Sequence, residues 1–302
     1  MHGNLLETHN RMMPEKESPE RSVNSRAVFN RTTAQGEWLR RIARADQLVS
    51  QAVPAAEILK FYAVVARFQQ YLFGTAERLL QETPATGERS DRIADPLPAE
   101  IIDRFPSFIS LVERTATEAL KEAAREISGQ GKLFQAQLLD TFWKEDPISP
   151  LSLGPVDFFA RAFLQPYAAA IRARTTLKWS GPAPFLCPMC KRKPGVAVLR
   201  PLGDGGQRSL ICSFCLAEWE FRRIVCPGCG EEDHAKLPVY TAEELKHVRV
   251  ESCDSCRLYV KSVDMTKNGL AEPVVDEIAS VSLDIWAQSQ GYTKLQTNFL
   301  QM

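Results

Sequence analysis

All eight cysteines of this chain occur as four Cys-x2-Cys pairs, and no cysteine lies outside them. A Cys-x2-Cys step in a tight turn directs two thiolates toward one point, which supplies half of a tetrahedral four-thiolate metal site. Four such steps supply two complete sites. The sequence therefore predicts that the metal ligands are Cys187, Cys190, Cys212, Cys215, Cys226, Cys229, Cys253 and Cys256.

Disulfide bonding and dithiol redox chemistry are two other uses of such cysteines. Disulfides are typical of secreted chains, whereas the N-terminal segment MHGNLLETHNRMMPEKESPE is polar throughout. It predicts neither a signal peptide nor a membrane span, so we expect a cytoplasmic protein with no transmembrane segment. Dithiol catalysis requires one motif at a strand-to-helix step and leaves a series of four unexplained. Metal binding is the favoured interpretation.

The long gap within each half of the cysteine-rich region holds enough chain for a hairpin. GVAVLR (195–200) and RSLI (208–211) flank GDGG (203–206), whose glycines supply the positive φ that a hairpin turn needs. Residues 237–240 and 247–250 form the corresponding pair of segments in the second half. Folding both hairpins pairs the first motif with the second and the third with the fourth. The alternative is an interleaved arrangement that pairs the first motif with the third.

The turns that hold the cysteines differ in one position. Gly230 follows the third pair and suits a knuckle in which backbone N–H groups approach a ligand sulfur. The equivalent positions after the other pairs are Lys191, Leu216 and Arg257. Most of the knuckles are therefore less rubredoxin-like than the third.

Basic residues flank the pairs and could offset the formal charge of about −2 of a divalent ion held by four thiolates. They are Lys191, Arg192, Lys193, Arg257 and Lys261. An ordinary solvated charged surface is the alternative. His234 and His247 lie in the same region, but the thiolates already complete both sites, so we expect neither histidine to be a ligand.

The sequence leaves the identity of the metal open. Tetrahedral thiolate accepts zinc or iron, and the spacing of the cysteines does not choose between them. We expect two mononuclear ions, which contribute folding energy because modules of this size bury little core. Zinc would be purely structural, whereas iron could also change its oxidation state.

The rest of the chain predicts an α+β protein in which an N-terminal all-α helical domain precedes two tandem rubredoxin-like or zinc-ribbon modules and a C-terminal helix. The expected boundaries are 1–30 for a disordered segment, 31–180 for the helical domain, 181–222 and 223–271 for the two modules, and 272–302 for the C-terminal helix and tail. The expected helices cover 36–52, 55–80, the stretch after Pro98 with a break or kink at Pro106, 131–144, 155–177 with a kink at Pro166, and 272–292. Alternation over 216–225 predicts a strand between the modules.

The helical region contains aromatic residues that could line a cofactor pocket but are more typical of a core at helical spacing. They are Phe61, Tyr62, Phe68, Phe105, Phe108, Phe158 and Phe159. The sequence contains no Gly-rich phosphate loop, H-E-x-x-H motif or G-x-S-x-G elbow, so we expect a binding protein with no catalytic residue, not an enzyme. With 37 basic and 37 acidic residues, its net charge gives no reason to expect a nucleic-acid partner.

The cysteine-rich half, over roughly 184–301, resembles the formate dehydrogenase accessory protein family (FdhE). The resemblance extends beyond the cysteines to CSFCLAEWEFRRIVCPGCG (212–230), ESCDSCRLYVK (251–261) and the closing DEIASVSLDIWAQSQGY (276–292). The residues that carry it around the pairs are Glu218, Trp219, Arg223, Glu251, Tyr259 and Lys261.

This resemblance implies a cytoplasmic maturation factor that is needed to obtain active respiratory formate dehydrogenase. It implies that the eight cysteines bind iron in rubredoxin-like knuckles, with zinc as the alternative, and that the protein associates with the catalytic subunit of the molybdenum enzyme. A homodimer is left open. The lysine and arginine that follow Cys190 and Cys256 depart from the glycine of rubredoxins and put the amide–sulfur hydrogen bonding in question.

Two hypotheses from other classes compete with this one. A zinc-ribbon nucleic-acid-binding protein would show a basic stripe, whereas acids and bases are intermixed here. A rubredoxin-like electron carrier would require iron that cycles reversibly between two oxidation states.

Overall fold

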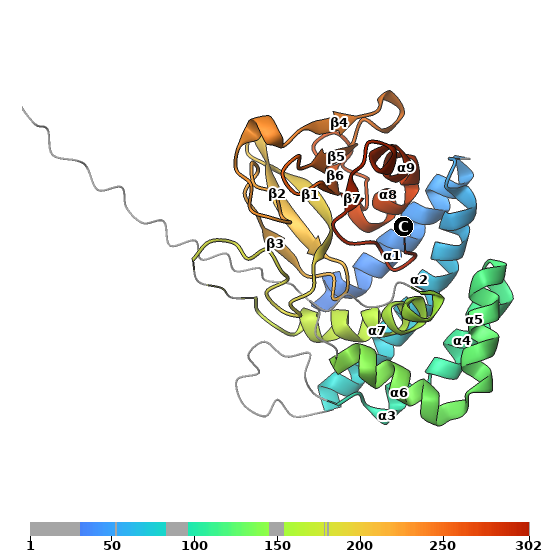
Figure 1. The fold of residues 1–302 in the computed structure, drawn as a ribbon. Coiled ribbons are helices and arrows are strands. Elements are labelled where there is room, and N and C mark those ends of the chain that lie inside the picture. The colour runs from blue at the N-terminus through green and yellow to red at the C-terminus, as the bar shows by residue number, and fades with distance from the viewer. Residues whose placement is uncertain are drawn as a thin grey trace, which may run out of the picture.

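The computed structural model describes residues 31–51, 53–82, 96–144, 154–177, 179 and 181–301. Helices form its N-terminal part, a single mixed sheet follows, and two short helices near the C-terminus lie beside both (Figure 1). The α+β prediction is confirmed. The segment expected to be disordered, 1–30, lies outside the described residues, and the predicted domain boundaries stay a prediction.

The N-terminal part forms seven helices within the described ranges. They are α1 (Arg31–Ser50), α2 (Ala56–Glu82), α3 (Ala99–Ile102), α4 (Phe105–Thr115), α5 (Glu118–Gly129), α6 (Gly131–Lys144) and α7 (Pro155–Ala173). The stretch after Pro98 thus forms three helices. Pro106 lies in the first turn of α4, where its missing N–H costs nothing, and Ala116 is extended and ends that helix. Helix α7 continues through Pro166 and ends four residues before the predicted boundary.

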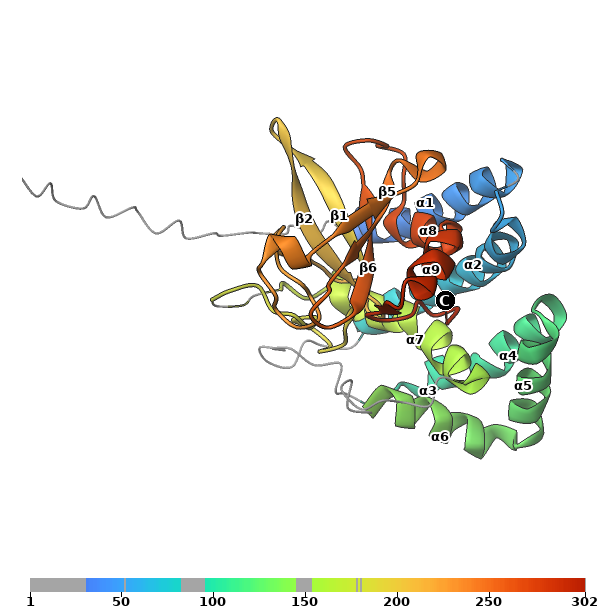
Figure 2. The ribbon, with the colours of Figure 1, turned by 45° about the horizontal axis from the view of Figure 1, so that its top comes forward.

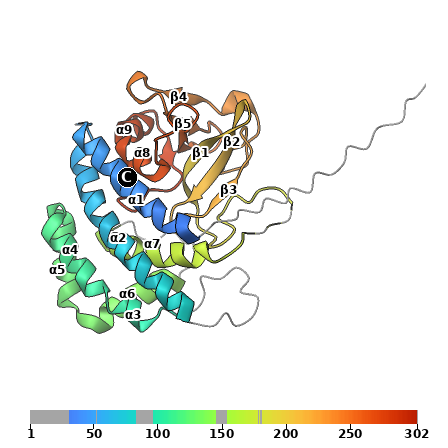
Figure 3. The same ribbon diagram turned by 180° about the vertical axis from the view of Figure 1, so that it is seen from behind.

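The aromatic residues of the helices form a core, as predicted. Helices α2 and α7 lie against each other at its centre, and α4–α6 pack outside them (Figures 1 and 3). Phe108 lies within 6.3 Å, centroid to centroid, of the rings of Phe158, Phe159 and Phe163. Phe299, near the C-terminus, enters the same core and lies 5.7 Å from the ring of Tyr62. The core of the helical part therefore depends on residues beyond the cysteine-rich region.

Both cysteine-rich modules contribute to one seven-stranded sheet. Its strands are β1 (Pro194–Leu202), β2 (Gly205–Cys212), β3 (Glu218–Glu220), β4 (Val239–Thr241), β5 (Val248–Ser252), β6 (Leu258–Asp264) and β7 (Thr293–Lys294), with the 3-10 turns η1 (His234–Lys236) and η2 (Glu243–Leu245) on either side of β4. The order is β3-β2-β1-β6-β5-β4, and β7 pairs with β6.

The predicted hairpins are both present. Strand β1 pairs with β2 in the register Ala197↔Leu210, and the turn begins at Gly203, which has a φ of 54°. Strand β4 pairs with β5. The strand predicted over 216–225 is shorter, because only β3 extends and pairs with β2. The modules join where β1 runs parallel to β6 with Val198 opposite Val263, so they are halves of one sheet (Figure 2).

The closing segment forms two helices, α8 (Pro273–Ala279) and α9 (Val281–Ser289), where one helix was predicted. The fully buried Lys261 of β6 explains the break. Its ammonium group donates hydrogen bonds to the main-chain carbonyls of Glu277 and Ser280, which a continuous helix would direct at its own N–H groups. Lys261 therefore neither offsets a metal centre nor joins a solvated surface, the two roles considered for it from the sequence.

Lys261 belongs to a buried cluster of two lysines and two carboxylates. Its partners are Asp284, at 2.5 Å, and Glu277, at 3.1 Å, and Lys294 of β7 binds both carboxylates as well. Burial alone would raise the pKa of Glu277, but Lys261 and Lys294 outweigh it and lower that pKa to about 2. The cluster is formally neutral and connects β6 and β7 to α8 and α9.

Helix α8 also connects the sheet to the N-terminal helices. Asp276 accepts hydrogen bonds from both Nε (3.0 Å) and Nη2 (2.5 Å) of Arg44 on α1, and His247 Nε2 lies 2.8 Å from the same carboxylate. Arg41 of α1 pairs with Glu272. His247 thus has a partner other than a metal. No described helix combines the length and the apolar character that crossing a membrane requires.

Replacing Glu277 with glutamine should lower the free energy of unfolding by about 3–5 kcal/mol at pH 7, because it leaves two buried lysines with one carboxylate. Glu57→Gln, which removes the exposed Glu57–Lys60 pair, should change it by less than about 0.5 kcal/mol. The two variants and the wild type are to be compared by denaturant unfolding of the metal-loaded protein.

The difference in free energy of unfolding between the wild type and Glu277→Gln should depend on pH. A carboxylate whose pKa is lowered by folding stabilises the folded protein at pH values above its unfolded pKa of about 4.3. This stabilisation is lost as the pH falls toward the folded-state pKa. The difference between wild type and Glu277→Gln should therefore narrow below about pH 4.3. A difference that stays constant on acidification would show that the Glu277 charge is not what stabilises the cluster.

Candidate metal centres

The structure brings the four Cys-x2-Cys pairs together in sequence order. The first and second pairs form one cluster and the third and fourth form another, and the four Sγ atoms of each cluster all lie within 4.8 Å of one another. The interleaved alternative is wrong. All eight cysteines are free thiols.

The distances between sulfur atoms fit a tetrahedral ion. Cys187 and Cys215 are 3.5 Å apart, and Cys190 and Cys212 are 3.3 Å apart. In the second cluster the Cys226–Cys256 and Cys229–Cys253 distances are both 3.7 Å. A metal–sulfur bond of about 2.3 Å gives a tetrahedral edge of about 3.8 Å, whereas a disulfide bond is only about 2.05 Å long.

The donor set is also suited to a soft or borderline ion. Each cluster offers four sulfur atoms and no oxygen or nitrogen ligand among the described residues. All-sulfur tetrahedral sites are typical of zinc and iron. Such an ion would join the two knuckles of its module and, if it is iron, would also supply one-electron redox chemistry.

All four knuckles share one backbone conformation. The residue after each second cysteine has a positive φ: 60° at Lys191, 59° at Leu216, 82° at Gly230 and 57° at Arg257. In each knuckle the first cysteine N–H donates to the carbonyl five residues later, as Cys187 does to Arg192. The departure from glycine therefore leaves the rubredoxin-like turn intact, although a side chain at positive φ costs about 1–2 kcal/mol.

The knuckles also supply hydrogen bonds to sulfur. The N–H groups of Phe214 and Gly228 each donate to the first cysteine of their own pair, Cys212 and Cys226, at 3.3 Å. Both are third in a C-x2-C step, and neither is the position where the glycine is replaced. One knuckle of each module therefore has an amide–sulfur hydrogen bond: the second, where Leu216 stands in place of the glycine, and the third, where Gly230 is retained. Such bonds stabilise thiolate charge.

The first centre is buried at the junction with the helices. Cys187, Cys212 and Cys215 are at most 1% exposed. Phe214, between the cysteines of the second pair, packs edge-on against Phe142 of α6 at 5.4 Å. Its neighbour Ser213 accepts a hydrogen bond through its main-chain carbonyl from a buried glutamine of α7. This cluster therefore connects the sheet to the helical core.

The sequence did not predict that connection. It indicated a countercharge or a solvated residue at Arg192, but the guanidinium group of Arg192 lies over the rings of Phe142 and Phe214, at 4.1 and 4.4 Å from their centroids. It also donates to the main-chain carbonyl of Phe142 at 2.8 Å. An aromatic residue inside a C-x2-C step was the only signal in the sequence. Lys191 and Lys193 are exposed, as a solvated surface requires.

The second centre is closer to solvent. Cys226 and Cys253 are buried, but Cys229 is exposed and Cys256 is partly exposed. Behind the fourth knuckle the closing Gly-Tyr contacts the turn: the Tyr292 hydroxyl donates to Asp254 at 2.6 Å, and Arg257 lies 4.0 Å from the Tyr292 ring centroid. The C-terminal segment thus supports this centre from one side only.

Burial raises the pKa of the Cys187 and Cys215 thiols, and the neighbouring cysteines contribute to the shift. A divalent cation at the cluster acts in the opposite direction, because it stabilises the thiolates. Metal binding at the first centre must therefore release protons, and its affinity should increase with pH.

The fold and these clusters define a class of protein: a helical domain joined to two rubredoxin-like four-cysteine modules that share one sheet. Residues 186–223 match the family described as "FdhE, central domain", and residues 224–301 match "FdhE, C-terminal domain". The chain is 31% identical over 197 residues to "Protein FdhE homolog" of Aquifex aeolicus, which covers 65% of this chain and 68% of that protein. The chain belongs to the FdhE family.

Two further comparisons extend over more of the chain. "Protein FdhE" of Escherichia coli O1:K1 / APEC is 25% identical over 272 residues, which cover 84% of this chain and 85% of that protein. The crystal structure of the FdhE protein from Pseudomonas aeruginosa superimposes with a TM-score of 0.61 at 23% identity, over 88% of this chain and 96% of that one. The superposition with this crystal structure supports the fold of the chain, including its helical part.

The backbone of the knuckles leads to a prediction about Lys191. Lys191→Gly should leave the free energy of unfolding unchanged or raise it by up to about 1 kcal/mol, because glycine adopts a positive φ without strain. Lys193→Gly, two residues away where φ is not positive, should lower it by roughly 0.5–1 kcal/mol. Denaturant unfolding of the metal-loaded variants measures both. An equal decrease in the free energy of unfolding in the two variants would show that the backbone at Lys191 is not strained.

The difference in burial leads to a second prediction. A chelator at limiting concentration should remove the ion of the second centre first. Cys229→Ser should accordingly keep one equivalent of metal and the near-ultraviolet circular dichroism of the core. Cys190→Ser should also lose the aromatic signal, because the first cluster holds Phe214 against α6.

Metal content by elemental analysis and the dichroism spectrum test this order. Cys190 and Cys229 are a matched pair, since each is the second cysteine of the first pair in its module. Loss of both ions at the same rate, or an equal spectral change in the two variants, would contradict the assigned roles.

Proposed function

We propose that this chain is a metal-binding accessory protein, chaperone-like in action, that assists the maturation of formate dehydrogenase by docking on its catalytic subunit. The observation that carries the proposal is the pair of four-cysteine clusters in a chain that belongs to the FdhE family. The resemblance found in the sequence implies this client. We further propose that the protein acts in the cytoplasm, where its thiols stay reduced, and that it works by binding and not by catalysis.

All eight cysteines are proposed as ligands of two ions, one for each cluster. The family resemblance favours iron, and zinc is the alternative. In either case the ion of the first centre would hold the sheet against α6 and α7, because three of its four cysteines are buried beside Phe214. The ion of the second centre would hold a module whose outer face is available to a partner.

The docking surface is proposed to include the exposed faces of the two modules. Cys229 is exposed, and the apolar residues Ile224 and Val239 are 56% and 53% exposed on the second module. Lys191 and Lys193 lie exposed on the first. A surface that combines apolar and basic groups suits a client with a partly acidic face.

An electron carrier is the second candidate function, and the exposure of Cys229 favours it. A thiolate ligand near solvent shortens the path for an electron to a docked protein, and the Gly228 N–H bond to Cys226 would help to tune the potential. Reversible bleaching of an iron–thiolate absorption band by a reductant would support this function. Stoichiometric zinc in protein from iron-replete cells would contradict it.

The proposed function predicts direct capture of the client. Anaerobically purified chain, with its metal content and oxidation state measured, should retain the formate dehydrogenase catalytic subunit in a pull-down. Reversing charge at Lys191 and Lys193 together should weaken capture several-fold, because rim charges chiefly affect association. Reversal of Lys60, an exposed lysine on α2, is the control.

Failure of the fully metal-loaded wild type to retain the catalytic subunit would sink the proposal. Undiminished capture by the double variant would remove the first module from the docking surface. Salt-dependent binding of DNA or RNA by the same preparation would instead favour the nucleic-acid alternative.

A further inference from the structure

Arg223 has no structural partner in the described part of the chain, unlike the other residues that carry the family resemblance around the cysteines. Glu218 forms a two-pronged ion pair with Arg200, and Trp219 donates its indole N–H to the carbonyl of Pro184. Tyr259 donates to Asp284. Arg223 is exposed, and no hydrogen bond or ion pair engages it among the described residues. Its side chain lines a cavity.

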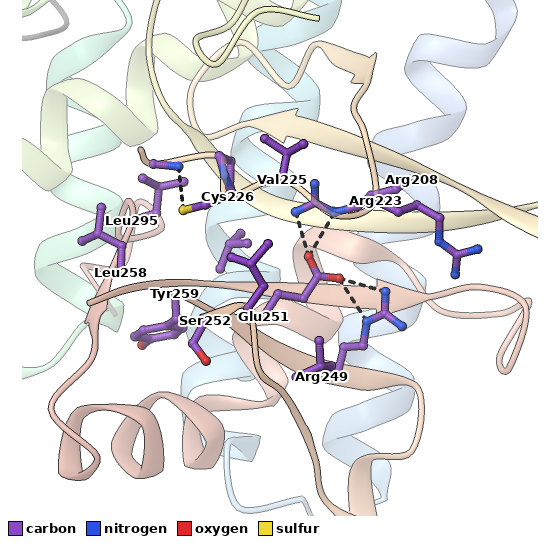
Figure 4. Close-up of a pocket in the computed structure, with 15 residues that line it drawn as sticks. Arg208, Arg223, Val225, Cys226, Arg249, Glu251, Ser252, Leu258, Tyr259 and Leu295 are labelled. Atoms are coloured by element: carbon purple, nitrogen blue, oxygen red, sulfur yellow. Dashed lines mark hydrogen bonds and ion pairs between the residues drawn. The ribbon is translucent and has the colours of Figure 1, made fainter. Parts of the chain in front are cut away.

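This cavity lies between the two modules and has a volume of about 220 Å³. A buried water needs roughly 10–15 Å³ of such volume, so the space is large enough for a small organic molecule. Its wall is formed by β2 of the first module, β4–β6 of the second, and the third knuckle. Figure 4 shows that the charged side chains gather on one side, while Cys226, Leu258 and Leu295 lie on the other.

The charged side has more positive than negative groups. Glu251 accepts from Nε and Nη2 of Arg208 on one oxygen, at 3.0 and 2.7 Å, and from Nε and Nη2 of Arg249 on the other, at 3.0 and 2.9 Å. With Arg223, the charged lining therefore has three arginines and one carboxylate. The ion pair with Arg208 is itself buried, with 2% and 12% of the two side chains exposed, so this end of the cavity is built by a fixed network (Figure 4).

The opposite side is apolar and reaches the second centre. Leu258 and Leu295 line it together with Cys226, a member of the second four-cysteine cluster (Figure 4). Val239 also lines the cavity and is 53% exposed. A molecule that fills the cavity would therefore have its apolar part beside a ligand sulfur of that centre.

We propose that this cavity binds a small organic anion, with a carboxylate or phosphate group at Arg223 and Arg249 and a compact apolar body directed toward Cys226. The planar guanidinium fork matches the two oxygens of a carboxylate or phosphate. Arg249 uses Nε and Nη2 for Glu251, and its Nη1 makes no hydrogen bond among the described residues. Arg208 is a positioning residue, because its three nitrogens already bind Glu251 and the carbonyl of Arg222.

The test is isothermal titration calorimetry on the full metal-loaded chain with benzoate and with phenyl phosphate. These probes share an apolar ring and differ in the anionic group, so they separate a carboxylate site from a phosphate site. Benzamide, which is neutral, is the third probe. We expect saturable binding of at least one anion, weakened by added salt, and none of benzamide.

Arg223→Ala should weaken binding at least tenfold, because a charge-assisted pair of hydrogen bonds is lost. Arg222→Ala is the matched control: the neighbouring side chain is also exposed, pairs with Glu232 and does not line the cavity. It should change the affinity by less than twofold. Metal content and thermal midpoint of both variants should equal those of the wild type, since neither arginine is buried.

A second measurement reports on the position of the ligand. With cobalt in place of the native ions, the thiolate-to-cobalt absorption of the second centre should shift when the anion binds, because Cys226 lines the cavity. The shift should require far more anion in Arg223→Ala. The proposal would be overturned if no saturable binding occurred at millimolar anion, or if Arg223→Ala and Arg222→Ala lowered the affinity for the anion equally.

Discussion

The convergence of four sulfur atoms at the first centre is the constraint on which most of this structure depends. Two knuckles that are separated by a hairpin meet there, and Phe214 between two of the ligands is thereby pressed against α6. The hairpin in turn supplies β1, whose free edge pairs in parallel with β6. Without that convergence, the sheet would lose its attachment to α6 and the strand that joins its halves. An ion at this position therefore acts over a much larger region than its own loop.

The sequence predicted the features that local chemistry determines. Spacing alone assigned all eight cysteines to two clusters, and GDGG (203–206) located a hairpin because only particular residues tolerate its turn. Hydrophobic periodicity likewise located most helices and identified Phe108 and Phe158 as core. These predictions require no knowledge of which segments lie next to one another.

The features that the sequence did not predict come from contacts between distant segments. Nothing near Lys261 indicates that its ammonium group will meet carbonyls of α8, yet this contact divides the closing helix. The parallel pairing of β1 with β6 is equally invisible, since neither strand carries a register signal for the other. The positive φ at Lys191 was missed for a different reason: the metal-binding geometry imposes it against the local preference of the residue. The cavity arginines Arg208 and Arg249 became neighbours only through the order of the strands.

The entry of Phe299 into the helical core has a consequence for biosynthesis. Arg161 of α7 donates a hydrogen bond to the main-chain carbonyl of Thr297, which is 136 residues later in the chain. At about 5–20 residues per second, a ribosome needs on the order of ten seconds to cover that interval. During this time α2 and α7 have emerged while the residues that complete their core have not. The nascent helical part must therefore be shielded, or remain loosely packed, until the cysteine-rich region and its closing segment have followed.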